Sequence, residues 1–266
     1  MAKDPSGVSP PPEAPPRSTR ADAERNVPGN LPESANAKDT AVSARSDIAA
    51  FLTTVRQQGA TVEAGQRGRL IFALDATMSR QPTWDMACTL QSDMFAEAAK
   101  VGGLDVQLVY YRGFGECRAS RFMADGAALA QLMTRIDCRG GRTQIGKVLG
   151  HARRQSEKLG IHALVFVGDA MEESVDELTG AAGELALRGI PAFMFQEGND
   201  ALTEQTFREI ARLTRGAYCR FRAGAADELR ELLRAVAVYA AGGMRALRDL
   251  SGRGGSGAVK LLEQMK

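Results

Sequence analysis

A chain of 266 residues with 44% hydrophobic side chains can bury one sizeable core, so length and composition predict one folded domain with flanking tails. The net charge of +2 comes from interspersed acids and bases, whereas nucleic-acid-binding proteins gather Lys and Arg on one face. The sequence contains neither an apolar run of about 18 residues that could cross a membrane nor an apolar N-terminal segment typical of a signal peptide. We therefore expect a cytoplasmic protein without nucleic-acid or membrane partners.

The cysteines of the chain do not form a recognisable pattern. They are widely spaced and include no C-x-x-C pair, which argues against a disulfide framework and against a zinc site. We predict reduced, mostly buried side chains at Cys88, Cys117, Cys138 and Cys219.

Residues 1–42 are predicted to form a disordered, proline-rich tail. Eight of the ten prolines fall within residues 1–32, among Ser, Ala and mixed charges, and such a segment buries too little apolar surface to offset the entropy of ordering. Apolar residues at helical spacing then predict a leading helix over residues 43–58. This helix would open a domain that spans residues 43–241.

Short apolar runs alternate with amphipathic segments over residues 69–240, the core of the predicted domain. The apolar runs lie at 70–74, 106–111, 163–167, 191–195 and 217–221, with a weaker run at 117–122. Helical spacing appears at 83–100, 125–136, 143–159, 174–188, 203–214 and 226–240. Strands that are apolar on both faces and separated by helices predict a doubly wound α/β fold, with a mostly parallel sheet covered by helices on both faces.

Residues 242–266 are rich in glycine and carry five Lys or Arg residues against two acids. This composition predicts a flexible, basic C-terminal tail. A short helix over residues 258–266 and a terminal docking peptide remain as alternatives.

Oxygen-bearing side chains follow the apolar runs where a doubly wound sheet binds its ligands, at the carboxyl ends of the strands. They are Asp75, Thr77, Ser79, Thr143 and Asp169. Carboxylates and hydroxyls are the hard donors that Mg²⁺ accepts, and the i, i+2, i+4 spacing of the first three suits a loop whose alternate side chains face one point. Each residue alone is also ordinary turn or helix-cap chemistry. Their combination favours a metal site.

These residues resemble the metal-ion-dependent adhesion site of the von Willebrand factor type A family, which combines a D-x-S-x-S loop with a later Thr and a later Asp. Thr77 departs from that pattern but keeps the hydroxyl. The resemblance extends over residues 69–240 and includes "FREIARLTRGAYCRF" and "ADELRELL" near the end of the core. It implies a six-stranded sheet of order 3-2-1-4-5-6 with strand 3 antiparallel, which would place Asp75 and Asp169 at the ends of neighbouring strands.

The same resemblance implies a function. Hydroxyl ligands leave a bound Mg²⁺ or Mn²⁺ with positive charge, so the cation can accept a partner's Asp or Glu carboxylate. We therefore expect a metal-dependent protein-binding module of the intracellular bacterial type rather than an enzyme. Members of this type act in multiprotein systems, which suggests an adaptor or assembly role with an AAA-ATPase or a stress-response complex.

A phosphotransferase of the haloacid dehalogenase type is the main alternative. Asp75 would then be the nucleophile, Thr143 would hold phosphate, Asp169 would hold magnesium, and Lys147 or Lys158 would neutralise the phosphate. Most soluble enzymes of that group carry a second Asp where this chain has Thr77. Dinucleotide binding and Ser/His/Asp hydrolysis are disfavoured, because the chain lacks both the G-x-G-x-x-G and the G-x-S-x-G motif.

Several residues near the predicted site allow two interpretations. Trp84 is either a core anchor or an exposed partner contact. Glu172 and Glu173 either make the rim acidic or favour the N-terminus of the next helix. Arg112, Arg118 and Arg121, on the predicted hairpin, are expected to be solvated, with binding of an acidic partner as the alternative. The Gly140-Gly141 pair before Thr143 is expected to be flexible.

Overall fold

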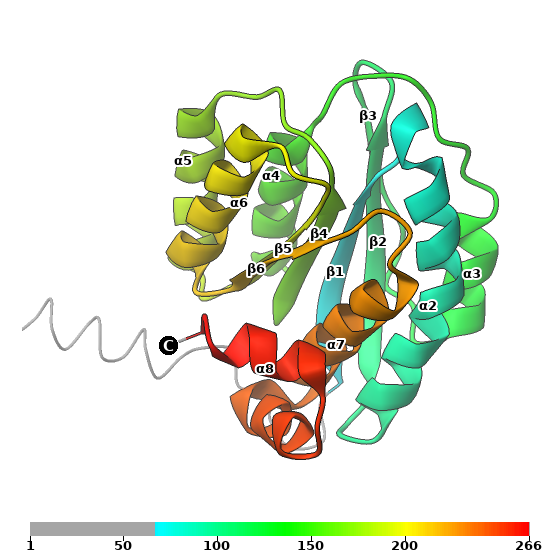
Figure 1. The fold of residues 1–266 in the computed structure, drawn as a ribbon, viewed down its shortest axis with the longest axis vertical. Coiled ribbons are helices and arrows are strands. Elements are labelled where there is room, and N and C mark those ends of the chain that lie inside the picture. The colour runs from blue at the N-terminus through cyan, green and yellow to red at the C-terminus, as the bar shows by residue number, and fades with distance from the viewer. Residues whose placement is uncertain (1–66, 266) are drawn as a thin grey trace, which may run out of the picture. The chain divides into compact units, whose positions relative to one another are not determined.

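Six strands form one sheet in the computed structural model, which describes residues 67–265 (Figure 1). They are β1 (Gly68–Asp75), β2 (Leu104–Arg112), β3 (Glu116–Ala119), β4 (Ala163–Gly168), β5 (Ala192–Glu197) and β6 (Ala217–Phe221). The order is β3-β2-β1-β4-β5-β6, with β3 antiparallel to β2 and all other neighbours parallel. The predicted fold class, strand order and antiparallel third strand are confirmed.

The central strands are apolar on both faces because helices cover both sides of the sheet. In β1, Leu70, Phe72 and Leu74 belong to one hydrophobic cluster, and Ile71 and Ala73 belong to the other. Successive side chains of a strand point to opposite faces, so a strand buried on both sides reads as a continuous apolar run. This is the physical origin of the apolar runs that predict the strands.

Seven helices are described in residues 67–265, and they divide between the two faces (Figure 1). One face is covered by α2 (Gln81–Ala99), α3 (Gly126–Met133), α7 (Ala226–Gly252) and α8 (Ser256–Leu262). The other face is covered by α4 (Ile145–Ser156), α5 (Val175–Ala186) and α6 (Ala201–Thr214). The order of the strands reverses between β1 and β4, so their carboxyl ends flank the crevice where doubly wound sheets bind ligands.

The C-terminal residues do not form the flexible tail that their composition predicts. The chain leaves helical geometry at Gly243, where φ is 66°, then resumes a helix to Gly252 and adds α8. Ala258 and Leu261 are fully buried, and a Cβ on Gly257 would lie 2.1 Å from the carbonyl oxygen of Glu231 in α7. Gly257 therefore permits close packing of α8 against α7. The prediction of a flexible tail, which rested on glycine content, is wrong.

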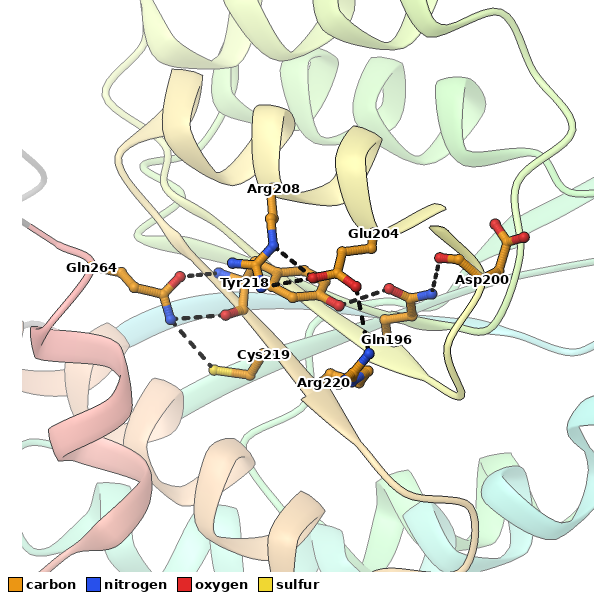
Figure 2. Close-up of polar contacts among 8 residues, drawn as sticks. All are labelled: Gln196, Asp200, Glu204, Arg208, Tyr218, Cys219, Arg220 and Gln264. Atoms are coloured by element: carbon orange, nitrogen blue, oxygen red, sulfur yellow. Dashed lines mark hydrogen bonds and ion pairs between the residues drawn. The ribbon is translucent and has the colours of Figure 1, made fainter. Parts of the chain in front are cut away.

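The end of the chain also covers the edge strand β6, as Figure 2 shows. The Gln264 amide donates to the Tyr218 carbonyl oxygen at 2.8 Å and accepts from the Tyr218 N–H at 2.9 Å, so it pairs with the backbone as a further strand would. The Tyr218 hydroxyl donates to Gln196 at 2.8 Å, and the Arg208 guanidinium lies 4.3 Å from the Tyr218 ring centre. Edge strands covered in this way are protected from pairing with other chains.

The remaining predictions on organisation have mixed outcomes. The predicted tail over residues 1–42 and the leading helix over 43–58 lie outside the described residues. The four cysteines have free thiols; Cys138 and Cys219 are buried and the other two are partly buried. Among residues 67–265, no helix combines the length and the apolar character needed to span a membrane.

Candidate metal site at the ends of β1 and β4

Asp75 ends β1 with a buried carboxylate, only 2% exposed. Its Oδ1 accepts a hydrogen bond of 2.7 Å from the backbone N–H of Thr77, because the chain turns into a short 3₁₀ helix, η1 (Met78–Arg80). Its Oδ2 is also buried but makes no hydrogen bond of standard geometry with the described residues. The nearest polar group on the paired residue of β2 is the Tyr111 hydroxyl, which is buried and equally without such a bond. A buried carboxylate oxygen without a partner is costly, so this atom marks a place where a positively charged ligand fits.

The hydroxyls that follow Asp75 connect it to the end of β4. Thr77 Oγ1 lies 3.4 Å from Ser79 Oγ, and the Ser79 hydroxyl donates to Asp169 Oδ2 at 3.4 Å. The intervening Met78 is 64% exposed, as alternation along the loop requires. The structure therefore brings together four of the five predicted site residues, Asp75, Thr77, Ser79 and Asp169.

Thr143 lies in a loop that is tied to the same edge of the sheet. The Arg139 N–H donates to the Ala76 carbonyl oxygen at 3.0 Å, and the Arg142 N–H donates to the Gly113 carbonyl oxygen at 3.1 Å. A Cβ on Gly141 would lie 2.1 Å from the same Gly113 oxygen. The expectation of a flexible glycine pair is wrong for Gly141, because the loop packs against the β2–β3 turn.

The Thr143 side chain is held by the segment that follows β4. Its hydroxyl donates to Glu173 and accepts a 2.8 Å hydrogen bond from the Glu172 N–H. Glu173 also accepts from the N–H groups of Ile145 and Gly146, so it caps the N-terminus of α4 rather than that of the next helix. Within the described part of the chain, Thr143 makes no hydrogen bond to the Asp75 loop.

Burial raises the pKa of Asp75 from 3.8 to about 6. The hydrogen bonds from Thr77 oppose this shift, the Asp169 carboxylate adds to it, and the Arg80 guanidinium opposes it weakly. Burial, together with the Asp75 and Glu173 carboxylates, also raises the pKa of Tyr111 well above its usual value. Without a cation, this pocket therefore disfavours negative charge on Asp75.

Neither a family model nor a curated protein matches the chain, but solved structures do. The VWA domain of SpRpn10 aligns with a TM-score of 0.51 at 11% identity, over 62% of this chain and 95% of that one. The chain has the fold of a von Willebrand factor type A domain. The resemblance drawn from the sequence is thus confirmed at the level of the fold.

Two larger proteins each contain a region that aligns with this fold. Proximal thread matrix protein 1 from the mussel byssus aligns with a TM-score of 0.52 at 17% identity, over 66% of this chain and 48% of that one. The pilus adhesin SpaC from Lactobacillus rhamnosus GG aligns with a TM-score of 0.50 at 11% identity, over 66% of this chain and 30% of that one. At these identities the likeness concerns the fold alone.

The donor set at the crevice of this type A fold fits a hard divalent cation. Within residues 67–265, no three His, Cys, Asp or Glu side chains gather into a metal cluster, and the candidate site instead combines two carboxylates with hydroxyls. Mg²⁺ and Mn²⁺ prefer such oxygen ligands and retain part of their water. The partnerless Asp75 Oδ2 supplies an acceptor. A separate open pocket of about 410 Å³ surrounds Thr143 and is lined by Arg142, Thr143, Glu172 and Glu173.

Two charged residues at this site, Arg80 and Glu197, were not predicted from the sequence. Arg80, only 4% exposed, places Nη1 3.5 Å from Asp169 Oδ2 and forms an ion pair with Glu197 at the end of β5. The Thr83 hydroxyl also donates to Glu197. The position of Arg80 directly after the D-x-T-x-S loop was the only local signal in the sequence that it belongs to the site. Its partner Glu197 lies 117 positions away, so no local pattern indicates the pair.

The structure shows how Trp84 and the three arginines near the β2–β3 hairpin are placed. Trp84 is 1% exposed and donates through Nε1 to the Met133 carbonyl oxygen at 3.1 Å, so it is a core anchor. Arg112 is not solvated as expected, because it pairs with Glu116 at 3.1 Å and donates to the backbone of residue 137. Arg118 and Arg121 are exposed as predicted.

Proposed function

We propose that this chain is a divalent-metal-dependent protein-binding module. Asp75, Thr77 and Ser79 would hold Mg²⁺ or Mn²⁺, Asp169 would contribute a carboxylate directly or through water, and Thr143 would join through water or after releasing Glu173. The bound cation would supply a positive charge that accepts an Asp or Glu carboxylate of a partner protein. No turnover is part of this proposal.

The observation that carries the proposal is the buried Asp75 carboxylate with its partnerless Oδ2. Burying a carboxylate costs several kcal/mol unless it is paired or binds a metal. The single backbone hydrogen bond to Oδ1 does not offset this cost, since the pKa of Asp75 is still raised to about 6. A cation beside Oδ2 would favour the charged carboxylate instead.

The fold supports an interaction role. One of the structures with this fold is a pilus adhesin, and another is the VWA domain of SpRpn10. We place the chain in a cytosolic multiprotein system, as an adaptor for an AAA-ATPase or a stress-response complex, on the strength of the sequence resemblance. The exposed Met78 beside the metal ligands provides apolar contact area for a partner.

The environments of Lys147 and Lys158 make the phosphotransferase alternative less favoured than the metal-dependent binding module. Lys147 donates from Nζ to the Gly115 carbonyl oxygen at 3.0 Å and to the Gln144 side chain at 2.8 Å. Lys158 follows α4, which begins near the site, and a helix of 12 residues is about 18 Å long. Lys147 is therefore already engaged by other acceptors, and Lys158 lies past the far end of α4.

Affinity capture with this chain as bait tests the proposal. A partner should be captured by the wild type in Mg²⁺, and lost both in EDTA and with Thr143→Ala. Thr134→Ala, the same substitution at an exposed residue at the end of α3, should retain the partner. A partner that binds equally in EDTA would contradict the proposal, and a beryllium fluoride adduct on Asp75 would favour the phosphotransferase.

A further inference from the structure

A buried ion pair lies directly behind the candidate metal site. The Arg80 guanidinium contacts two carboxylates, that of Asp169 at 3.5 Å and that of Glu197 at shorter range. Glu197 is nearly as buried as Arg80 and also accepts from the Thr83 hydroxyl. The charges of Arg80 and Glu197 therefore compensate each other inside the core.

The contact between Arg80 and Asp169 is of a different kind. The Asp169 side chain is 31% exposed, and its Oδ2 receives both the Ser79 hydroxyl and the guanidinium of Arg80. This is the oxygen that faces the site. A cation bound beside Ser79 must share the Asp169 carboxylate with the Arg80 guanidinium. The two positive charges repel each other at short range in a partly buried site.

We propose that Arg80 is a positioning residue that acts as a built-in counter-cation: it holds Asp169 and weakens metal binding at the site. This inference rests on the proposed function. Glu197 anchors the guanidinium, so that Asp169, the more exposed partner, is the group that changes partners when a metal ion binds. The site would then bind its cation reversibly, because Arg80 stabilises Asp169 again when the cation leaves.

Metal titration of variants tests this role, with Mn²⁺ as the probe. Arg80→Met combined with Glu197→Gln removes both buried charges and leaves the net charge of the protein unchanged. We expect this double variant to bind Mn²⁺ about tenfold more tightly than the wild type, because the lost guanidinium contacts Asp169 directly, whereas the lost Glu197 carboxylate contacts Arg80 and Thr83. Arg80→Lys keeps the charge and should bind within about threefold of the wild type.

A purely structural role for Arg80 predicts a different result. Both variants would then melt at lower temperature, while their affinity for Mn²⁺ would be unchanged or weaker, and this result overturns the inference. Asp75→Asn in each background separates the two proposals. Mn²⁺ binding that depends on Asp75 but has equal affinity in the wild type and the double variant refutes only the role of Arg80. Absence of Asp75-dependent binding from both proteins refutes the proposed function and this inference together.

A second measurement needs only folded wild-type protein, in case the double variant does not fold. The Nε–Hε resonance of Arg80 should shift when Mg²⁺ is added to the ¹⁵N-labelled wild type, because Asp169 changes partners. The same titration of Asp75→Asn should leave the resonance in place. A resonance that stays unchanged in the wild type at saturating Mg²⁺ overturns the inference.

Discussion

Replacement of Asp75 by Asn should stabilise the metal-free protein. Asp75 is 2% exposed, and its Oδ2 makes no hydrogen bond within the described residues. Asparagine has nearly the same shape and keeps an oxygen for the N–H of Thr77. The substitution therefore removes a buried charge while retaining the hydrogen bond that orients the loop.

The pKa of Asp75 gives the size of the effect. A pKa raised from 3.8 to about 6 in the folded protein corresponds to about 3 kcal/mol of lost stability above pH 6. Because the folded pKa is the higher one, the cost is absent below about pH 4, where both states are protonated, and grows between pH 4 and pH 6. We expect Asp75→Asn to recover roughly 1–3 kcal/mol at pH 7.5.

Urea denaturation in EDTA at pH 7.5 and at pH 4 measures this prediction. The variant should have the higher free energy of unfolding at pH 7.5, and the difference should shrink at pH 4. Asp137→Asn, which alters an exposed carboxylate, should change stability by less than about 0.5 kcal/mol. A variant that is less stable than the wild type at pH 7.5, or a difference that does not depend on pH, would refute the reasoning.

Four further substitutions test packing and hydrogen bonding in the fold. Gly257→Ala should cost roughly 2–3 kcal/mol in chemical denaturation, because its Cβ would meet the backbone of Glu231 at 2.1 Å. Gly180→Ala, where a Cβ meets no atom within 4 Å, should instead stabilise α5 by up to about 1 kcal/mol. Trp84→Phe should lower the free energy of unfolding by roughly 1–3 kcal/mol through the lost core hydrogen bond and volume. Gln264→Ala should cost about 1 kcal/mol and leave the edge of β6 open, so sedimentation should show more self-association than for the wild type.

The sheet could be predicted from the sequence because its physics is local and periodic. The run 217–221 coincides with β6, and the run 163–167 falls one residue short of β4. Strands buried on both faces leave continuous apolar runs, and the helices between them leave a different period. The strand order, in contrast, came from the family resemblance and not from periodicity.

The rest of the structure depends on contacts that no local pattern encodes. The C-terminal segment looks like a flexible tail by composition, yet Gly257 is where α8 approaches the backbone of α7. Similarly, Arg80 follows the predicted metal loop directly, but its role depends on Glu197, which only folding brings to it. The hydroxyl of Thr143 lies at the predicted edge and is held there by Glu173, a contact across 30 positions of sequence.

Calorimetric titration of the wild type and Asp75→Asn with Mg²⁺ tests the central claim most directly. The wild type should bind one Mg²⁺ at pH 7.5, more weakly below about pH 6 as Asp75 becomes protonated, and Asp75→Asn should not bind. In thermal melts, Mg²⁺ at about 100 times its Kd should then stabilise the wild type by about 2.7 kcal/mol and leave the variant unchanged. Equal Mg²⁺ binding by the two proteins, or no binding by the wild type, would contradict the assignment of this site.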